Sequence, residues 1–160
     1  MTGPEVRLAT PEDLPAVYAL RHEVFVVGQD VPEDMERDED DEVCDHVVAL
    51  HGAAVVGTGR LLAPQTPGGR ALVGRMAVAS AERGRGVGSA VLALLEQRAV
   101  ELGRPGIELH AQVHARRFYE RVGYRPSGDV FLEAGIEHVT MRKDLPSAGA
   151  VTAADRPPAA

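Results

Sequence analysis

The sequence of 160 residues predicts one domain of the α/β (α+β) class, and three stretches lead to that prediction. Residues 72–102 combine a short apolar strand, a glycine-rich turn and apolar residues at helical spacing. Residues 47–62 and 130–142 each hold two strand-like runs around a short turn, which predicts two antiparallel hairpins. With the segments between them, strands and helices follow in the order β, α, α, β, β, β, α, β, α, β, β.

The N-terminal part predicts a strand at 5–9 followed by two helices. Thr10-Pro11-Glu12-Asp13 has the pattern of a helix start, with Thr10 as the N-cap and an acidic residue three positions later. We expect a first helix over 11–22 and a second, short helix over 22–27 that ends at Gly28.

The middle of the chain predicts strands at 47–51, 54–62 and 72–78, then a helix that ends before Gly103. The apolar stripe of this helix consists of Val87, Val91, Leu94, Leu95, Ala99 and Leu102.

The C-terminal part predicts a strand at 107–112, a helix at 115–122 and a hairpin with strands at 130–132 and 138–142. Side chains alternate across the strand at 107–112, so one face carries Ile107, Leu109 and Ala111, and the other Glu108, His110 and Gln112. Residues 146–160 are rich in Ala and Pro and are expected to form a disordered tail to a domain at 1–145.

Residues 33–45 contain nine acidic residues and one arginine. Two interpretations stay open: a solvated loop, or a negatively charged rim that attracts an amine substrate. Metal binding by Asp38, Asp40 and Asp41 is set aside, because the glycine and glutamate positions of an EF-hand loop are absent.

Bulk properties exclude several classes of protein. The net charge of −7 argues against nucleic acid or an anionic membrane as a partner. A single cysteine allows no internal disulfide. No apolar run approaches the roughly 20 residues of a membrane span, and no signal peptide is recognisable, so we expect a cytoplasmic protein.

The glycine-rich turn at 83–88, Arg-Gly-Arg-Gly-Val-Gly, predicts an anion site. The first turn of a helix has free N–H groups and partial positive charge, and glycines let the backbone approach a phosphate. The Gly-Lys-Ser/Thr of a Walker loop is absent, and Ser89 stands where a dinucleotide fingerprint needs its third glycine.

The pattern Arg83-x-x-Gly86-x-Gly88 resembles the pyrophosphate-binding motif of the GNAT N-acetyltransferases, Gln/Arg-x-x-Gly-x-Gly/Ala. The resemblance implies that this segment holds the pyrophosphate of acetyl-coenzyme A. The residues so assigned are Arg83, Gly84, Arg85, Gly86, Val87, Gly88 and Ser89.

Residues 112–124 strengthen the match, because they resemble the family's late segment N-x-x-A-x-x-x-Y-E-x-x-G-F/Y, with Gln112 in place of the usual Asn. Residues 25–29, 110–112 and 135–138 further resemble the ElaA-like branch. The resemblance covers about residues 5–145 and implies the GNAT fold, a mixed, mostly antiparallel central sheet flanked by helices.

The family's chemistry assigns further roles. Backbone N–H groups of Met76, Ala77 and Val78 would bind the thioester carbonyl, and Gln112 would contact the coenzyme. Tyr119 would protonate the departing thiolate. Either Glu108 or His110 could be the base that deprotonates the amine, and His46 and His138 are less favoured candidates.

The resemblance implies an acetyl-coenzyme A-dependent N-acetyltransferase that acts on a primary amine of a small molecule or peptide, by direct attack in a ternary complex, without a metal. Two alternatives stay open: a non-catalytic acyl-coenzyme A sensor, and transfer of a longer acyl chain. A monomer or a homodimer is expected.

Overall fold

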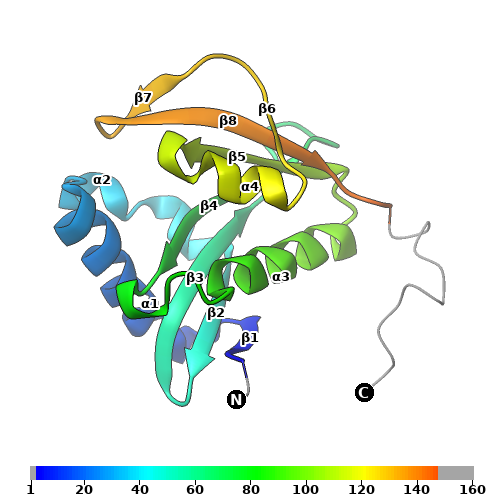
Figure 1. Cartoon of the computed structure of the whole chain (residues 1–160). Coiled ribbons are helices and arrows are strands. Elements are labelled where there is room, and N and C mark those ends of the chain that lie inside the picture. Colours follow the sequence, from blue (N-terminus) through cyan, green and yellow to red (C-terminus); the bar gives the residue numbers. More distant parts are fainter. Residues whose placement is uncertain (1–2, 148–160) are drawn as a thin grey trace.

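A computed structural model describes residues 3–147 and shows one sheet with helices on both faces (Figure 1). The strands are β1 (Glu5–Leu8), β2 (Asp45–His51), β3 (Ala54–Leu62), β4 (Ala71–Val78), β5 (Gly106–Gln112), β6 (Arg125–Pro126), β7 (Phe131–Glu133) and β8 (Ile136–Asp144). The helices are α1 (Leu14–Arg21), α2 (Glu33–Glu36), α3 (Val87–Glu101) and α4 (Arg116–Arg121). None of these helices is long and apolar enough to cross a membrane.

The sheet has the order β1-β2-β3-β4-β5-β8-β6, with β7 paired to β8. Only β4 and β5 run parallel in the described sheet, so the predicted mixed, mostly antiparallel sheet is confirmed. The predicted bounds of β3 are those observed, and β6 is a short strand that the sequence did not predict. Most of the predicted tail, from residue 148 on, lies outside the described residues.

The N-terminal helices differ from prediction. The expected helix over 11–22 is a 3₁₀ turn at Pro11–Asp13 followed by α1, and the expected short helix is a π-helical turn at His22–Val27 with Gly28 as its C-cap. The predicted start is confirmed, since Asp13 Oδ2 accepts a hydrogen bond of 2.7 Å from the Thr10 backbone N–H.

Side-chain alternation along β2 separates two apolar layers. Val47 and Ala49 pack in the main core with α3, whereas Val48 and Leu50 pack with Val17 of α1 on the opposite face. Gly59 of β3 permits the close approach of α3. A Cβ atom at this position would lie 2.8 Å from Leu95 Cδ1 and 2.7 Å from the sulfur of Met76, closer than real atoms pack.

The strands β4 and β5 pair only at their beginnings and then diverge (Figure 1). Residues 71–73 of β4 pair with residues 107–109 of β5, and residues 74–78 of β4 do not pair with β5. A bulge accompanies the divergence. Thr58 of β3 pairs with Ala77 but Arg60 pairs with Gly74, so β4 holds one extra residue. Arg75, in the bulge, has a φ of +53°, in the left-handed region that a residue other than glycine seldom adopts.

The acidic segment is not simply a solvated loop, and this corrects the first interpretation. Glu36 of α2 and Asp41 of a 3₁₀ turn at Glu39–Glu42 are buried, as is their partner Arg21. Arg21 Nε lies 2.6 Å from Glu36 Oε1, and its Nη1 lies 2.7 Å from Asp41 Oδ1. These two carboxylates face inward because each completes a buried ion pair.

A second arginine continues the same network. Arg60 of β3 donates from Nη1 to Asp41 at 2.8 Å and to Asp38 at 2.6 Å. Arg75 completes it by donating from Nε to the backbone oxygen of Glu36 at 2.9 Å. We call Arg21, Arg60, Arg75, Glu36, Asp38 and Asp41 the ion network. It ties the acidic segment to the bulge of β4.

Replacing Asp41 with Asn should destabilise the fold by about 3–5 kcal/mol, because it removes the fully buried carboxylate that Arg21 and Arg60 share and leaves each with one counter-charge instead of two. The matched control is Asp40→Asn, an exposed neighbour, which should change stability by about 0.5 kcal/mol or less. Urea unfolding monitored by circular dichroism measures both. Equal stability of the two variants would contradict a structural role for the network.

Candidate active site

The divergence of β4 and β5 opens a cavity of about 870 Å³. Its walls come from the bulged half of β4, the second half of β5, the segment after α1, the start of α4 and the β7–β8 turn. The predicted site residues that line it are Met76, Val78, Arg83, Glu108, His110, Gln112 and Tyr119. The strand divergence therefore brings together residues that lie far apart in the sequence.

The β5-facing edge of residues 74–78 has no strand partner. Backbone N–H groups alternate in direction along a strand, so part of this stretch has donors free to point into the cavity. Met76 and Val78 line the cavity, whereas Ala77 packs into a small core cluster with Leu20 and Val24. This geometry supports the predicted carbonyl-binding role of this segment, which stays a prediction.

The glycine-rich turn leads into an uncapped helix. Gly86 is the N-cap of α3 with a φ of +82°, and no side chain caps the first turn. Gly84 has a similarly positive φ of +78°. Within the turn, Arg83 lines the cavity and Arg85 and Ser89 are exposed. A long helix with an exposed, uncapped N-terminus beside arginine side chains has the donor set that an anion requires.

Tyr119 of α4 lies at the cavity wall. Only 8% of the residue is exposed, and its ring packs edge-on against Phe118 and Tyr124. Burial raises the pKa of Tyr119 to about 12. Among residues 3–147 the phenol oxygen has no hydrogen-bond partner, so its proton is free for a group inside the cavity.

His110 of β5 is paired with a carboxylate that the sequence analysis did not select. Its Nδ1 lies 3.0 Å from Glu133 Oε1, at the end of β7. Because the carboxylate accepts, Nδ1 carries the proton and Nε2 keeps its lone pair. The hydrogen bond to Glu133 raises the pKa of His110 above its ordinary value. This arrangement is that of a base oriented by an acid.

His138 lies on the other side of Glu133. Its Nδ1 donates to the backbone oxygen of Ile136 at 2.7 Å, and its Nε2 is 3.7 Å from Glu133 Oε2. The ring of Phe131 stacks on it. His138 therefore lines the cavity as a buried neighbour of the His110–Glu133 pair.

The other predicted base candidate, Glu108, is engaged in an ion pair. Glu108 Oε1 accepts a hydrogen bond of 2.9 Å from Arg142 Nε on β8, so a guanidinium already neutralises this carboxylate. Of the two candidates on β5, Glu108 is therefore held in an ion pair, whereas His110 keeps Nε2 outside its hydrogen bond to Glu133.

Gln112 forms a reciprocal amide pair with Gln29. Gln112 Nε2 donates to Gln29 Oε1 at 2.8 Å, and Gln29 Nε2 donates back at 3.3 Å. In this structure the Gln112 side chain thus joins β5 to the segment after α1, and its contact with a coenzyme stays a prediction.

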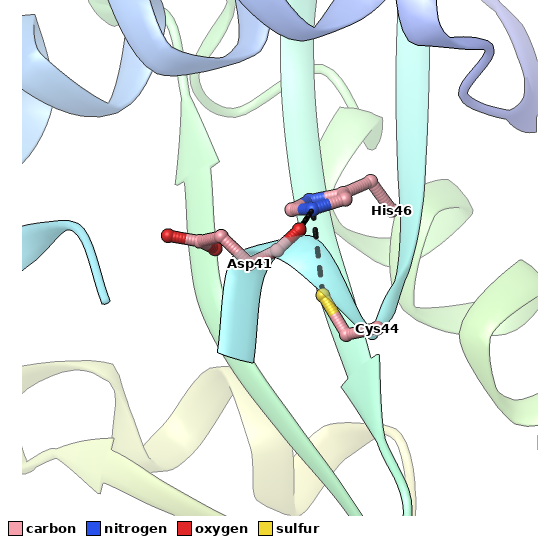
Figure 2. Close-up of side chains that lie close together, drawn as sticks. All are labelled: Asp41, Cys44 and His46. Carbon is pink, nitrogen blue, oxygen red and sulfur yellow. Dashed lines mark hydrogen bonds between the residues drawn. The ribbon is translucent and has the colours of Figure 1, made fainter. Parts of the chain in front are cut away.

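His46 lies outside this cavity, beside Cys44 and Asp41 (Figure 2). The three groups are committed elsewhere. His46 Nε2 lies 2.9 Å from the backbone oxygen of Asp41, and the Asp41 carboxylate pairs with Arg21 and Arg60. Burial raises the pKa of the Cys44 thiol to about 11, which keeps it protonated. All three groups are therefore held by contacts within the protein.

Comparison with known proteins identifies the family. Residues 8–145 match the acetyltransferase (GNAT) domain. The chain belongs to the GNAT acetyltransferase family. It is 38% identical over 134 residues to an uncharacterized N-acetyltransferase of Bacillus subtilis, YjcF, covering 83% of this chain and 94% of that protein.

The predicted likeness to ElaA is also confirmed. ElaA of Escherichia coli is 30% identical over 132 residues, which is 81% of this chain and 86% of ElaA. Its crystal structure superposes with a TM-score of 0.78, over 88% of this chain and 99% of that one.

Two further solved structures share the fold. The crystal structure of a putative N-acetyltransferase from Lactobacillus plantarum gives a TM-score of 0.82 at 32% identity, over 91% of this chain and all of that one. The structure of an aminoglycoside 6′-N-acetyltransferase complexed with coenzyme A gives a TM-score of 0.73 at 16% identity. The match covers 89% of this chain and 98% of that chain.

Proposed function

We propose that this acetyltransferase transfers the acetyl group of acetyl-coenzyme A to a primary amine of a small molecule or peptide, by direct attack in a ternary complex. One observation carries the proposal. The cavity between β4 and β5 is lined both by Arg83, which begins the glycine-rich turn before the uncapped start of α3, and by His110, which Glu133 orients. A candidate anion site and a candidate base thus adjoin one cavity, as the transfer requires.

The residues of the α3 start fit a pyrophosphate. The backbone at Gly84 and Gly86 has positive φ values, and a Cβ at either position would meet no atom within 4 Å. The first-turn N–H groups are uncapped and Arg83 lies at the cavity wall. Acetyl-coenzyme A, held there, supplies an acetyl group activated as a thioester.

The chain's own groups meet the needs of the reaction. An alkyl amine has a pKa near 10.4 and arrives protonated, so His110 Nε2 must accept a proton before the nitrogen can attack. Free N–H groups at 74–78 stabilise negative charge on the carbonyl oxygen. As the new C–N bond forms and the C–S bond breaks, Tyr119 gives its proton to the sulfur. His110 releases the first proton to solvent and then accepts the amine's second proton, while Tyr119 recovers a proton from solvent, so that the overall reaction releases one proton.

Release of free coenzyme A thiol distinguishes an acetyltransferase from a non-catalytic acyl-coenzyme A sensor. Wild-type protein with acetyl-coenzyme A and a panel of primary amines should release thiol and yield acetylated amine, detected by a thiol-reactive dye and by mass spectrometry. A sensor would bind the coenzyme in calorimetric titration and release no thiol with any amine. That outcome would overturn the enzymatic proposal.

The His110–Glu133 pair predicts a specific pH dependence. Protonated His110 cannot accept a proton, so kcat/KM should rise with pH through a pKa above the ordinary value near 6.5. Glu133→Gln keeps an oxygen that can accept the hydrogen bond but removes the carboxylate charge that raises this pKa, so the acidic limb should move to lower pH. His110→Gln should lower kcat by about 10²–10⁴-fold.

The matched control is Glu137→Gln, which removes an exposed carboxylate of β8 outside the pair. With one amine substrate throughout, titration of the amine contributes equally to every profile. An acidic limb in Glu133→Gln that coincides with the wild-type limb would remove His110 as the base.

Tyr119→Phe should lower kcat by about 10²–10⁴-fold and leave coenzyme affinity nearly unchanged. The hydroxyl acts only on charge that develops during reaction, and the ring keeps its packing against Phe118 and Tyr124. Turnover and melting temperature measured on one preparation test this. Near-normal turnover with a lowered melting temperature would show that the tyrosine is structural.

A further inference from the structure

Arg75 and His110 face the same part of the cavity from opposite walls. The strands β4 and β5 are in register at Leu72 and Glu108, before they diverge. His110 lies two residues further along β5, on the face away from α3, and Arg75 lies three residues further along β4. Arg75 reaches α2, on that same face, where its Nη2 lies 3.3 Å from the backbone oxygen of Met35. Both side chains line the cavity.

Arg75 has unused hydrogen-bonding capacity. Its Nε donates to the backbone oxygen of Glu36, and Nη2 reaches Asp38 Oδ2 only at 3.3 Å. Within the part of the chain that the structure describes, Nη1 has no partner. The side chain is 28% exposed, so this nitrogen is open to a group in the cavity.

Two arginines at this wall keep N–H donors without a partner among the described residues. Burial and the nearby charge of Arg60 lower the pKa of Arg75, while the charges of Asp38 and Glu36 raise it. Arg60 adds a second unmatched donor, since its buried Nε has no partner and lies near Gly74 at the cavity wall. A half-buried cation with a free N–H group gains most from an anionic ligand.

The opposite wall carries the complementary charge. The hydrogen bond from His110 lowers the pKa of Glu133 most, and the positive charge of Arg75 also lowers it. Arg75 and the His110–Glu133 pair therefore act on the same space.

We propose that the acceptor is a primary amine that also carries a carboxylate, such as an amino acid. Its carboxylate binds Arg75 Nη1 while its amino nitrogen lies at His110 Nε2. This deepens the proposed function and rests on it. Acetylation then proceeds at the nitrogen as described, and the carboxylate takes no part in bond changes.

A purely cationic amine fits this wall less well. A diamine would place its second positive charge against the Arg75 guanidinium, and like charges in a shared site are unfavourable. The carboxylate therefore provides selectivity as well as affinity.

The experiment compares each amino acid with the amine that lacks its carboxylate. The pairs are phenylalanine with phenethylamine, lysine with cadaverine, and γ-aminobutyrate with propylamine. For at least one pair, wild-type protein should favour the amino acid by about 10–100-fold in kcat/KM, the range expected for a charge-assisted hydrogen bond. In Arg75→Gln the ratio should fall towards one. Because both members of a pair report on the same variant, a general loss of activity cancels in the ratio.

The matched control is Arg37→Gln. Arg37 is a charge of the same segment, but it stacks on Tyr18 outside the cavity, so the ratio should not change. If thiol is released but no pair shows a preference for the amino acid, this inference is overturned and the proposed function stands. The same holds if Arg75→Gln keeps the full wild-type preference. If Arg75→Gln does not fold, the ratio of kcat/KM between amino acid and amine in the wild-type protein tests the inference by itself. Absence of thiol release with every amine overturns the proposed function, and this inference with it.

Discussion

The site depends on the bulge that holds Arg75 in a left-handed backbone conformation in the middle of β4. Such a conformation costs about 1–3 kcal/mol for a residue other than glycine, so it persists only where its surroundings fix it. The hydrogen bond from Arg75 to the backbone of Glu36 and the ion pair with Asp38 provide that fixation. The extra residue turns β4 away from β5, and the cavity occupies the space that the divergence creates.

The ion network gives the acidic segment a structural purpose and links stability to the site. Arg21 holds Glu36 and Asp41, and Arg60 holds Asp41 and Asp38, so α2 is fixed against the bulge. Burial alone would raise the pKa of Asp41, but hydrogen bonds and charge from Arg21 and Arg60 hold it well below its usual range. The stability from this carboxylate is therefore present near neutral pH and is lost as pH falls below the ordinary range of an aspartate.

Local patterns predicted much of the fold and the faces on which several candidate site residues lie. The alternation along 107–112 placed Ile107 in the core and His110 in the cavity, because strand periodicity depends on little beyond neighbouring residues. The glycine spacing at 84–88 predicted the helix start for the same reason. The network escaped prediction, because Arg21 and Arg60 meet their partners across 15 to 22 residues and a charge run looks solvated in sequence. Glu133 was missed likewise, since only the pairing of β7 and β8 brings it to His110.

The coenzyme is proposed to bind where β4 and β5 diverge. The most direct test is a titration of ¹⁵N-labelled protein with coenzyme A, in which the amide chemical shifts are followed. The largest changes are expected at residues 74–78, which line the free edge of β4, and at 84–89, in the turn that follows Arg83. Changes confined to the groove near Leu14 and His46, or no changes at saturating coenzyme, would contradict it.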